Sequence, residues 1–434
     1  MRDFMNDERF AGITKSEERI LLASPTMHKT EDGGSWTELD YVREAFETNW
    51  ITCVGSNLTA LEPLIADYLG AKYVVGLSCG TSAIHLAVKL AANKLYGSNT
   101  GVSTPDGATL GGCLYGRKVF CTDLTFDATV NPIVYEGGEP VLIDSEYETW
   151  NMDPRALEKA FGKFPDVKLV VCAHLYGTPG RIDEIKRICE SHGALLIEDA
   201  AESLGSTYKG KQTGTWGDYG VISFNGNKII TGSAGGALIC NSSEEAEKAR
   251  KWSTQSREPA PWYQHEELGY NYRMSNIIAG IVRGQMEYLE EHIAGKKAIY
   301  DRYSNGLKGL PVKMNPTGGH DSDTNCWLSC MIINHDAMAP HERSDREAVY
   351  SSEQGKSSPS EILDAMNAFN AEGRPIWKPM HMQPIYKNNY YVTADATKSV
   401  SEDIFRRGLC LPSDIKMADV QQDFVIEVIR RCFR

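Results

Sequence analysis

Apolar residues along the chain fall into two kinds of pattern, and each kind predicts a different element. Short runs of mostly apolar residues, without polar alternation, predict strands that are covered on both faces. Because helical patterns lie between several of these runs, they indicate a mainly parallel sheet with helices around it. The seven runs are residues 73–77, 118–121, 140–144, 168–173, 194–198, 219–224 and 236–240.

Helical periodicity marks the rest of the chain. A helix is expected from Thr37, with Leu39, Val42 and Phe46 on one face, and a second over 58–69 that stops at Gly70. Further amphipathic patterns cover residues 182–191, 274–307 and 420–432.

One more helix is predicted to open at Ser358, because an N-cap Ser is followed by Pro359 and then Glu361. An apolar run over residues 327–333 predicts a strand in the same C-terminal part.

These elements predict an α/β protein with a large domain and a small one. We expect a polar peripheral segment over residues 1–35, a large α/β domain over 36–290 and a smaller α+β domain over 291–434. Residues 97–116 are rich in Gly, Ser and Thr and are expected to form an inserted loop.

Composition and charge narrow the function classes. The chain has 434 residues, of which 41% are hydrophobic and 24% charged, which is typical of a globular protein. A net charge of −13 disfavours a nucleic-acid-binding surface. The 11 cysteines show no C-x-x-C pair, and there is neither a signal-peptide core nor an apolar run long enough for a membrane span. We therefore expect a cytoplasmic protein that binds neither nucleic acid nor membrane.

Common cofactor motifs are missing, and four other features remain. The chain has neither G-x-G-x-x-G nor a Walker A loop. Gly80 and Thr81 lie at a strand-to-helix turn that suits a phosphate, although such a turn can equally be a plain helix cap. Asp199 follows a buried strand, where open α/β sheets bind ligands, or else caps the next helix.

The other two features are an amine and an aromatic ring. Lys228 follows the strand that contains Ser223 and stands among small residues; it could form a Schiff base or be a solvated surface charge. Phe126 follows another strand and could stack on a planar ring or belong to the core. Together the four features supply what a pyridoxal phosphate enzyme needs: an amine, an anion for the pyridine nitrogen, a phosphate cup and a stacking surface.

The sequence also resembles a known family, the DegT/StrS pyridoxal phosphate-dependent sugar aminotransferases, which have the fold-type-I, aspartate-aminotransferase-like architecture. The resemblance is carried by SCGTSAIHLAVKLA, LTFDATVNPIVYEGGEPVLIDSE, the long run from AHLYGTPGR to FNGNKIITG, LGYNYRMSNIIAGIVRGQ and WKPMHMQP.

Carried over residue by residue, the resemblance implies catalytic roles for two residues. Lys228 matches the lysine that forms the Schiff base with pyridoxal 5′-phosphate (PLP), and Asp199 matches the partner of the pyridinium nitrogen. Glu202 matches a position that lines the cofactor.

The resemblance implies further contacts. Gly80, Thr81 and Ser223 match phosphate contacts and Phe126 the stacking ring, while Asn271 would reach the phosphate of a neighbouring subunit. It thus implies a homodimer with shared active sites. Arg273 and His381 match positions on the substrate side. Arg257 and Lys378 are further candidates for binding substrate anions, with ordinary surface salt bridges as the alternative for all four residues.

The implied reaction moves an amino group from L-glutamate, which leaves as 2-oxoglutarate, to a nucleotide-linked keto-6-deoxy sugar. The segment FNGNKII is similar to that of members acting at C4 of UDP-2-acetamido-4-keto-2,6-dideoxyhexoses. Alternatives are a PLP-dependent sugar dehydratase, a cyclitol aminotransferase and a non-catalytic sensor or scaffold with this fold. The dehydratase branch carries His in place of the lysine, so Lys228 argues against it.

Overall fold

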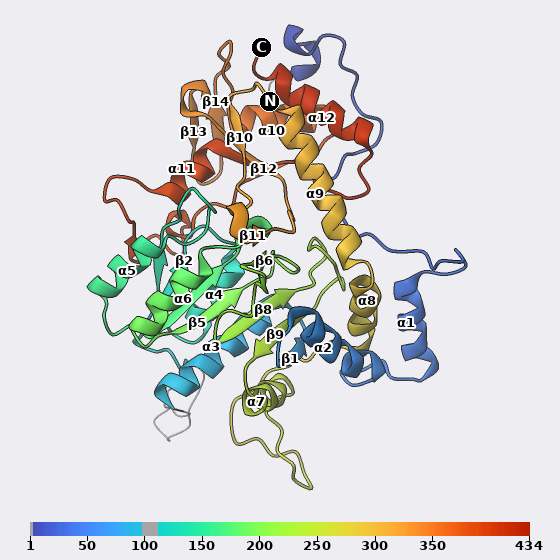
Figure 1. The fold of residues 1–434 in the computed structure, drawn as a ribbon, viewed down its shortest axis with the longest axis vertical. Coiled ribbons are helices and arrows are strands. Elements are labelled where there is room, and N and C mark those ends of the chain that lie inside the picture. Colours follow the sequence, from blue (N-terminus) through green and yellow to red (C-terminus); the bar gives the residue numbers. More distant parts are fainter. Residues whose placement is uncertain (1–2, 98–111) are drawn as a thin grey trace.

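A computed structural model describes residues 3–97 and 112–434 of the chain. Most of the loop expected over residues 97–116 therefore lies outside the described residues. The large part of the molecule is built on an eight-stranded sheet, and a four-stranded antiparallel sheet lies in the C-terminal part (Figure 1).

The strands of the large sheet confirm the predicted runs to within two residues at their ends. Their order is β1-β9-β8-β5-β4-β2-β3-β16. They are β1 (Tyr73–Leu77), β2 (Lys118–Thr122), β3 (Glu139–Ile143), β4 (Leu169–Ala173), β5 (Leu195–Asp199), β8 (Tyr219–Ser223), β9 (Gly236–Cys240) and β16 (Tyr391–Val392).

The sheet is mainly parallel, with one reversed strand. β9 pairs antiparallel with both β1 and β8, while the strands from β8 to β16 pair parallel. β16 comes from the C-terminal part of the chain and pairs with β3 through Tyr391↔Leu142 and Val392↔Ile143. The predicted α/β class and fold type are thus confirmed.

Helices cover both faces of the large sheet, because alternate residues of each buried strand point to opposite sides. On one face, side chains of α2, α5, α6 and α8 pack against residues such as Val170 and Ile222. On the other, α3, α4 and α7 pack against residues such as Val171 and Val221. The helices are α2 (Ser56–Leu69), α3 (Gly80–Tyr96), α4 (Asn131–Tyr135), α5 (Pro154–Lys163), α6 (Ile182–Ser191), α7 (Ser243–Ser253) and α8 (Asn276–Met286).

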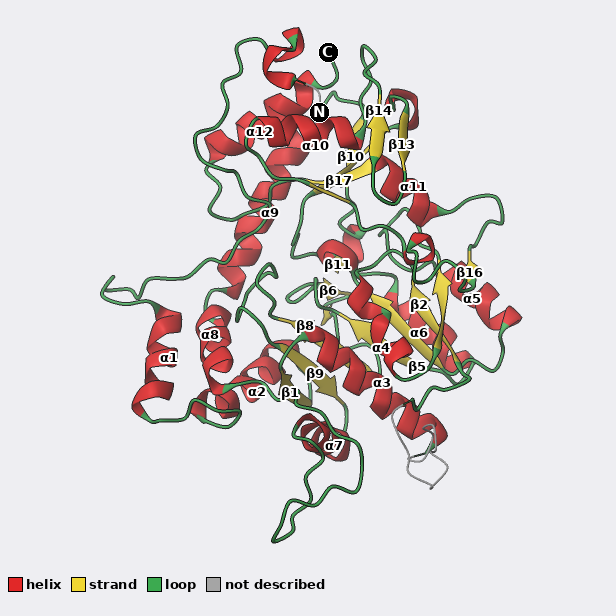
Figure 2. Cartoon of the chain, turned by 180° about the vertical axis from the view of Figure 1, so that it is seen from behind, coloured by secondary structure: helices red, strands yellow, loops and turns green. Residues whose placement is uncertain are grey.

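The C-terminal part surrounds the small sheet, which has the order β10-β12-β17-β15 (Figure 2). Its core is formed with α9, α10 and α12 and includes Tyr303, Met366 and Val425. The strands are β10 (Val312–Met314), β12 (Cys330–Ile333), β15 (Arg374–Pro375) and β17 (Gly408–Cys410), and the helices are α9 (Leu289–Gly306), α10 (Pro359–Ala368), α11 (Val400–Arg407) and α12 (Asp419–Arg431).

Two small pairings complete the strand inventory of the described residues. A three-stranded sheet has the order β11-β6-β7, and β13 pairs with β14 as a hairpin. Their bounds are β6 (Thr207–Tyr208), β7 (Lys211–Gln212), β11 (Ser322–Asp323), β13 (His341–Arg343) and β14 (Ala348–Tyr350).

Two predicted elements need correction. The single helix expected over residues 274–307 is two helices, α8 and α9, which break at Glu287 and Tyr288. The strand expected over 327–333 begins only at Cys330, because the amides of Trp327 and Ser329 bond to the side chains of Asn325 and Ser413 and not to a neighbouring strand. The predicted start of α10 is confirmed: the Ser358 side chain accepts a hydrogen bond from the Glu361 amide at 3.1 Å.

The first long helix, α1 (Thr37–Glu47), begins where it was predicted and packs against α8 (Figure 1). Its apolar face is not fully buried, however. Leu39 is 45% exposed and Phe46 is 60% exposed, and Trp50 and Ile51 just beyond the helix are also exposed. An apolar surface of this kind on a folded chain is typical of a protein interface.

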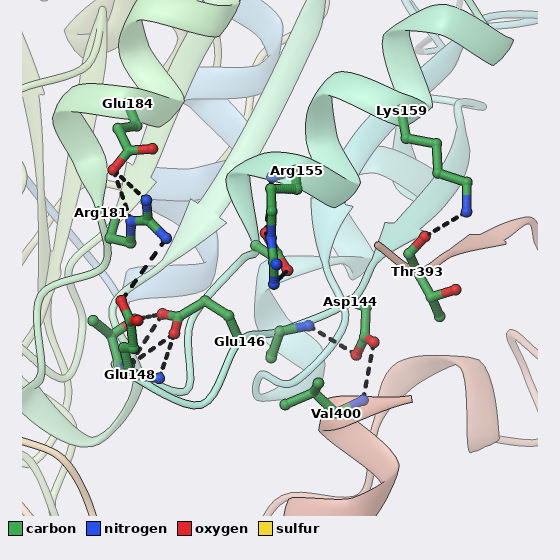
Figure 3. A network of polar contacts seen from close by, with 12 residues as sticks. Asp144, Glu146, Glu148, Arg155, Lys159, Arg181, Glu184, Thr393 and Val400 are labelled. Carbon is green, nitrogen blue, oxygen red and sulfur yellow. Dashed lines mark hydrogen bonds and ion pairs between the residues drawn. The ribbon is translucent and has the colours of Figure 1, made fainter. Parts of the chain in front are cut away.

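The C-terminal part is fastened to the carboxyl edge of the large sheet by a polar network (Figure 3). Asp144, directly after β3, accepts hydrogen bonds from the backbone nitrogens of Val400 at 2.9 Å and Ser401 at 3.0 Å, so its carboxylate sits at the N-terminus of α11. Nearby, the Lys159 ammonium donates to the Thr393 carbonyl at 2.8 Å. A carboxylate at a helix N-terminus is favourable because it satisfies free N–H groups and faces the positive end of the helix dipole.

Candidate active site

A pocket with about 890 Å³ of space free of protein atoms lies at the carboxyl edge of the large sheet, where β5 and β8 end and α3 begins. Ligands bind at this edge in open α/β sheets. Seven of the predicted site residues line it: Gly80, Thr81, Phe126, Asp199, Glu202, Ser223 and Lys228.

Lys228 lies in the loop between β8 and β9, and its side chain is only 11% exposed. Its ammonium nitrogen Nζ is 3.7 Å from Oε1 of Glu202 and 4.4 Å from the centroid of the Trp327 ring. These contacts exclude the alternative of a solvated surface lysine. The amine is held inside the pocket between a carboxylate and an aromatic face.

Asp199 is the last residue of β5 and is buried. Its Oδ2 accepts a hydrogen bond from the Thr129 hydroxyl at 2.7 Å, and its Oδ1 accepts one from the Ala201 amide at 3.1 Å. No helix follows it directly, so the helix-cap alternative does not apply. Each carboxylate oxygen can accept a further hydrogen bond, so the group can still receive an N–H donor from the pocket.

Glu202 connects the lysine to the wall of the pocket. Its Oε2 accepts from the Tyr176 amide at 2.7 Å, and its Oε1 accepts from the Trp377 indole at 3.4 Å. Burial raises the pKa of the Glu202 carboxyl, and the nearby Lys228 ammonium works against that rise. The carboxyl thus lies beside the amine with both of its oxygens held by hydrogen bonds from the wall of the pocket.

The N-terminus of α3 and the end of β8 meet in the wall of the pocket. The Cys79 sulfur accepts from the Ser82 amide at 3.3 Å, which fixes the first turn of α3. A Cβ on Gly80 would lie only 3.0 Å from Cβ of Ser223, so glycine allows this close approach. The first turn of a helix offers free N–H groups and a positive dipole end to a phosphate, with the Ser223 hydroxyl beside it.

Phe126 is 51% exposed and lines the pocket, with its ring centroid 5.3 Å from that of Trp377. It is therefore not a core residue, which was its alternative reading. Its ring and Trp377 present an aromatic wall on which a planar ligand can stack.

Several pocket residues were missed by sequence reasoning. Trp327 comes from the C-terminal part, and its indole donates to the Asn227 carbonyl at 2.7 Å. Trp377 lies in a segment that carried the family resemblance. So does Tyr176, which does not line the pocket but whose amide holds Glu202. That resemblance was the available signal, since hydrophobic patterning alone does not distinguish a pocket aromatic from a core one. The remaining pocket residues not predicted are Cys79, Ile84, Thr125, Ala128, Thr129, Ala173, His174, Ala201, Asn225 and Asn227.

Three predicted residues do not line the pocket of their own chain. Asn271 is exposed. Arg273 donates to Glu62 at 2.6 Å and to the Gly76 carbonyl at 2.9 Å, so its guanidinium supports β1 instead of facing the pocket. His381 is bonded through Nδ1 to Asp123 at 2.8 Å and stacks on Tyr391.

The two further anion-binding candidates also have ordinary contacts in this chain. Arg257 lies over the Tyr263 ring at 4.3 Å, and Lys378 pairs with Asp345 at 2.6 Å. Neither residue lines the pocket.

The pocket fits PLP on its own chemistry. It combines an amine, a buried carboxylate that can accept a further N–H, a helix N-terminus with a hydroxyl for the phosphate, and an aromatic wall. Among residues 3–97 and 112–434, by contrast, no group of three or more His, Cys, Asp and Glu side chains is arranged to hold a metal ion. Nor does any helix in those ranges have the length and hydropathy to cross a membrane.

The fold and the pocket together are those of a pyridoxal phosphate-dependent aminotransferase. More specifically, the chain belongs to the DegT/DnrJ/EryC1/StrS aminotransferase family, whose model matches residues 34–430. The cofactor predicted from the sequence, PLP, is thereby confirmed, and so is the prediction that the protein is an enzyme.

The chain is similar to proteins from several bacteria. It is 40% identical over 422 residues to EpsN of Bacillus subtilis, a candidate pyridoxal phosphate-dependent aminotransferase, covering 96% of each chain. It is 31% identical over 416 residues to GDP-perosamine synthase of Caulobacter vibrioides, covering 95% of this chain and 97% of that one.

The fold is shared with solved structures. Helicobacter pylori PseC, an aminotransferase involved in the biosynthesis of pseudoaminic acid, superimposes with a TM-score of 0.78 at 18% identity, covering 96% of this chain and 99% of that one. At this identity the likeness concerns the fold alone.

Proposed function

We propose that this enzyme transfers the amino group of L-glutamate to the keto carbon, at C4, of a nucleotide-linked 4-keto-6-deoxy sugar, with UDP-2-acetamido-4-keto-2,6-dideoxyhexose as the preferred substrate class. The products are 2-oxoglutarate and the amino sugar. The observation that carries the proposal is that Lys228 and Asp199 line one pocket.

The roles of the residues follow from their positions. PLP, when bound, supplies an electron sink that stabilises the negative charge formed when the α-proton of the amino acid is removed. Lys228 Nζ takes that proton and later delivers one to the sugar carbon, as general base and then general acid. Asp199, with its buried negative charge, would accept the N–H of the pyridine ring of bound PLP. Glu202, whose Oε1 is 3.7 Å from Nζ, orients the amine and exchanges protons with it.

Other residues that line the pocket bind the cofactor and position it. Gly80, Thr81 and Ser223 cradle a phosphate at the N-terminus of α3, and Phe126 stacks on the planar ring. Arg273 and His381 stay proposals as substrate-side residues, since neither lines the pocket of its own chain.

A homodimer with shared active sites is part of the proposal. Asn271 is exposed in its own chain, which suits a residue that reaches a partner's cofactor phosphate. Exposed apolar side chains on and beyond α1, with Phe46 and Trp50 among them, are available to be buried by a second copy.

Two further elements of the proposal concern the nucleotide and the compartment. The similarity of the FNGNKII segment to UDP-sugar members favours UDP, whereas the GDP-perosamine synthase relative makes GDP the alternative nucleotide. We place the enzyme in the cytoplasm, because all 11 cysteines are free thiols, which is typical of a reducing compartment.

The test is a mass-spectrometric assay of glutamate with a panel of UDP-, GDP- and dTDP-linked keto sugars. We expect amination at C4 of the UDP-linked acetamido sugar, and loss of PLP absorbance when glutamate alone is added. Lys228→Ala should lower kcat by about 10⁴-fold. Turnover by that variant near the wild-type rate would refute the role of Lys228, and a preference for a GDP- or dTDP-linked sugar would refute the assignment of the nucleotide.

A further inference from the structure

Three side chains hold the backbone of the loop that carries Lys228. Nδ1 of His292 is 2.7 Å from the Ile229 carbonyl oxygen, one residue beyond the lysine. The Thr231 amide donates to Oε1 of Gln285 at 3.2 Å, and the Trp327 indole donates to the Asn227 carbonyl at 2.7 Å. Both His292 and Gln285 are buried, so these hydrogen bonds are shielded from water.

His292 is itself backed by residues from the N-terminal part of the chain. Its Nε2 lies 2.9 Å from Nε2 of His28, and Nδ1 of His28 lies 2.7 Å from Oε1 of Glu38 on α1. The His28 ring stacks on Tyr288, with centroids 3.8 Å apart and planes 6° apart. Gln285 donates to the same Glu38 oxygen at 2.6 Å, so the two supports of the lysine loop share one carboxylate.

The positions of the protons in this series of hydrogen bonds follow from the atoms that each ring nitrogen contacts. A carbonyl oxygen only accepts, so Nδ1 of His292 must carry a hydrogen. Burial lowers the pKa of His292, and the charges of His28 and Lys296 lower it further, against the bond to Ile229, so His292 is neutral and its Nε2 is an acceptor.

His28 then donates from both ring nitrogens, from Nδ1 to Glu38 and from Nε2 to His292. Burial alone would raise the pKa of the Glu38 carboxyl, but the hydrogen bonds from His28 hold it below its usual value. The hydrogen bonds therefore run in one consistent direction, from His28 through His292 to the Ile229 carbonyl.

We propose that His292, oriented by the His28–Glu38 ion pair, is a positioning residue that fixes the backbone next to Lys228 and thereby aims its amine into the pocket. Ile229 is buried and its carbonyl is next to the lysine, so losing its donor lets the peptide rotate and moves Nζ. The inference rests on the proposed function of Lys228. It assigns a role in the reaction to the contacts of His28 and Glu38, which lie outside the pocket.

Two variants of the full-length protein separate positioning from simple packing. His292→Leu removes both hydrogen bonds of the ring. His292→Asn restores a side-chain N–H at the place of Nδ1 while losing the contact with His28. Ile299→Ala is the matched control, since Ile299 is buried on the same helix, α9, but packs in the C-terminal core.

The first readout is amide hydrogen exchange of residues 225–235, measured by mass spectrometry on cofactor-free protein, where no catalytic activity is needed. We expect His292→Leu to speed exchange in this segment about tenfold, and His292→Asn to restore most of the protection. Ile299→Ala should leave this segment unchanged and speed exchange only in the C-terminal part.

The second readout is the reaction of the PLP-loaded enzyme with glutamate alone. We expect His292→Leu to lower the rate constant about tenfold while the KM for glutamate stays within about twofold, because the amine is misplaced but the substrate contacts remain. Unchanged exchange in His292→Leu, or an effect equal to that of Ile299→Ala, would overturn the positioning role.

Further outcomes stay distinguishable. If no sugar of the panel is aminated, the proposed function fails, yet the exchange measurement still decides the structural claim about His292. Should His292→Leu fail to fold, His28→Asn replaces it, because it keeps a donor for Glu38 while it removes the contact with His292 and the stacking on Tyr288. That variant should speed exchange about threefold, and wild-type exchange in it would count against the chain of hydrogen bonds.

Discussion

Two buried aspartates stand at the carboxyl edge of the same sheet and have different surroundings. Asp199 ends β5 and lines the pocket, where its carboxylate accepts, among the residues that the structure describes, hydrogen bonds from the Thr129 hydroxyl and the Ala201 amide alone. Asp123 follows β2 and is enclosed by the C-terminal part of the chain. It accepts from the His381 amide and is bonded to His381 Nδ1, each at 2.8 Å, and it accepts from the Ser401 hydroxyl at 2.5 Å.

The comparison shows that the edge of the sheet does not by itself decide what a carboxylate does. Parallel strands bring the residues that follow them to one edge, and the segments that cover this edge separate structural groups from reactive ones. Asp123 is occupied by a segment more than 250 positions away in the sequence, as is Asp144. Asp199 keeps free acceptor capacity in a cavity, and only such a group can serve a ligand.

The largest effect should come from Asp199→Asn, which removes the negative charge with little change in shape. We expect kcat to fall about 10³-fold, because the negative charge of Asp199 stabilises the protonated pyridine nitrogen of PLP. The free energy of unfolding should change by less than about 1 kcal/mol. Steady-state kinetics and urea unfolding measure the two quantities, and a variant that loses stability but keeps its kcat would contradict the division between the two aspartates.

Asp123→Asn should show the reverse. Removing one partner of a buried, hydrogen-bonded charge pair should cost about 3 kcal/mol of unfolding free energy. Because Asp123 does not line the pocket, kcat should stay within about threefold. An effect transmitted through His381 would appear in the KM for the sugar. Equal losses of kcat in the Asn variants of both aspartates would show that they form one functional unit.

A smaller effect is expected for Asp144→Ala. The carboxylate holds the first two amides of α11 and loses both in this variant, so we expect a cost of about 1–2 kcal/mol in unfolding free energy. Asp395→Ala is a suitable control, because Asp395 also accepts from nearby amide and hydroxyl groups but is exposed. Urea unfolding curves of the two variants should differ clearly. Identical curves would show that the hydrogen bonds of Asp144 to α11 do not stabilise the fold.

The smallest effect is a pH dependence of the Asp123–His381 pair. Burial lowers the pKa of His381, but the hydrogen bond to Asp123 and its charge outweigh burial and raise it above the usual 6.5. The pair therefore contributes fully below about pH 6.5 and loses its contribution as the pH rises through the raised pKa.

The matching measurement compares the wild type with His381→Gln by urea unfolding at about pH 6 and about pH 9. The difference in unfolding free energy should shrink by about 1 kcal/mol at the higher pH. A difference that grows with pH would mean that His381 is bound as the neutral imidazole.

Local patterns in the sequence predicted much of the fold. The seven long strands of the large sheet were recognisable because each is a short apolar run bounded by turns. The mainly parallel direction followed from the helical patterns between these runs, but the reversal of β9 did not, since a single strand buried on both faces has the same pattern in either direction. The two-residue strand β16 is too short to leave any pattern.

The candidate site divides in the same way. Residues at the ends of predicted strands, such as Asp199 and Ser223, could be placed in one pocket from topology, and the family resemblance added Glu202. Trp327 reaches Lys228 only through the packing of the C-terminal part. His28 and His292 are joined across 264 positions by one hydrogen bond, and neither belongs to a motif that marks such a contact.

The short strand β16 also has a consequence for the solubility of the large sheet. Without it, β3 would be the last strand, and the amides of Leu142 and Asp144 would lose the Tyr390 and Val392 carbonyls that they now bond at 2.8 Å and 3.0 Å. An open, apolar edge of this kind invites pairing with other copies of itself. By covering this edge, Tyr391 and Val392 of β16 protect the enzyme from aggregation, and a fragment that ends at residue 290 would lack this protection.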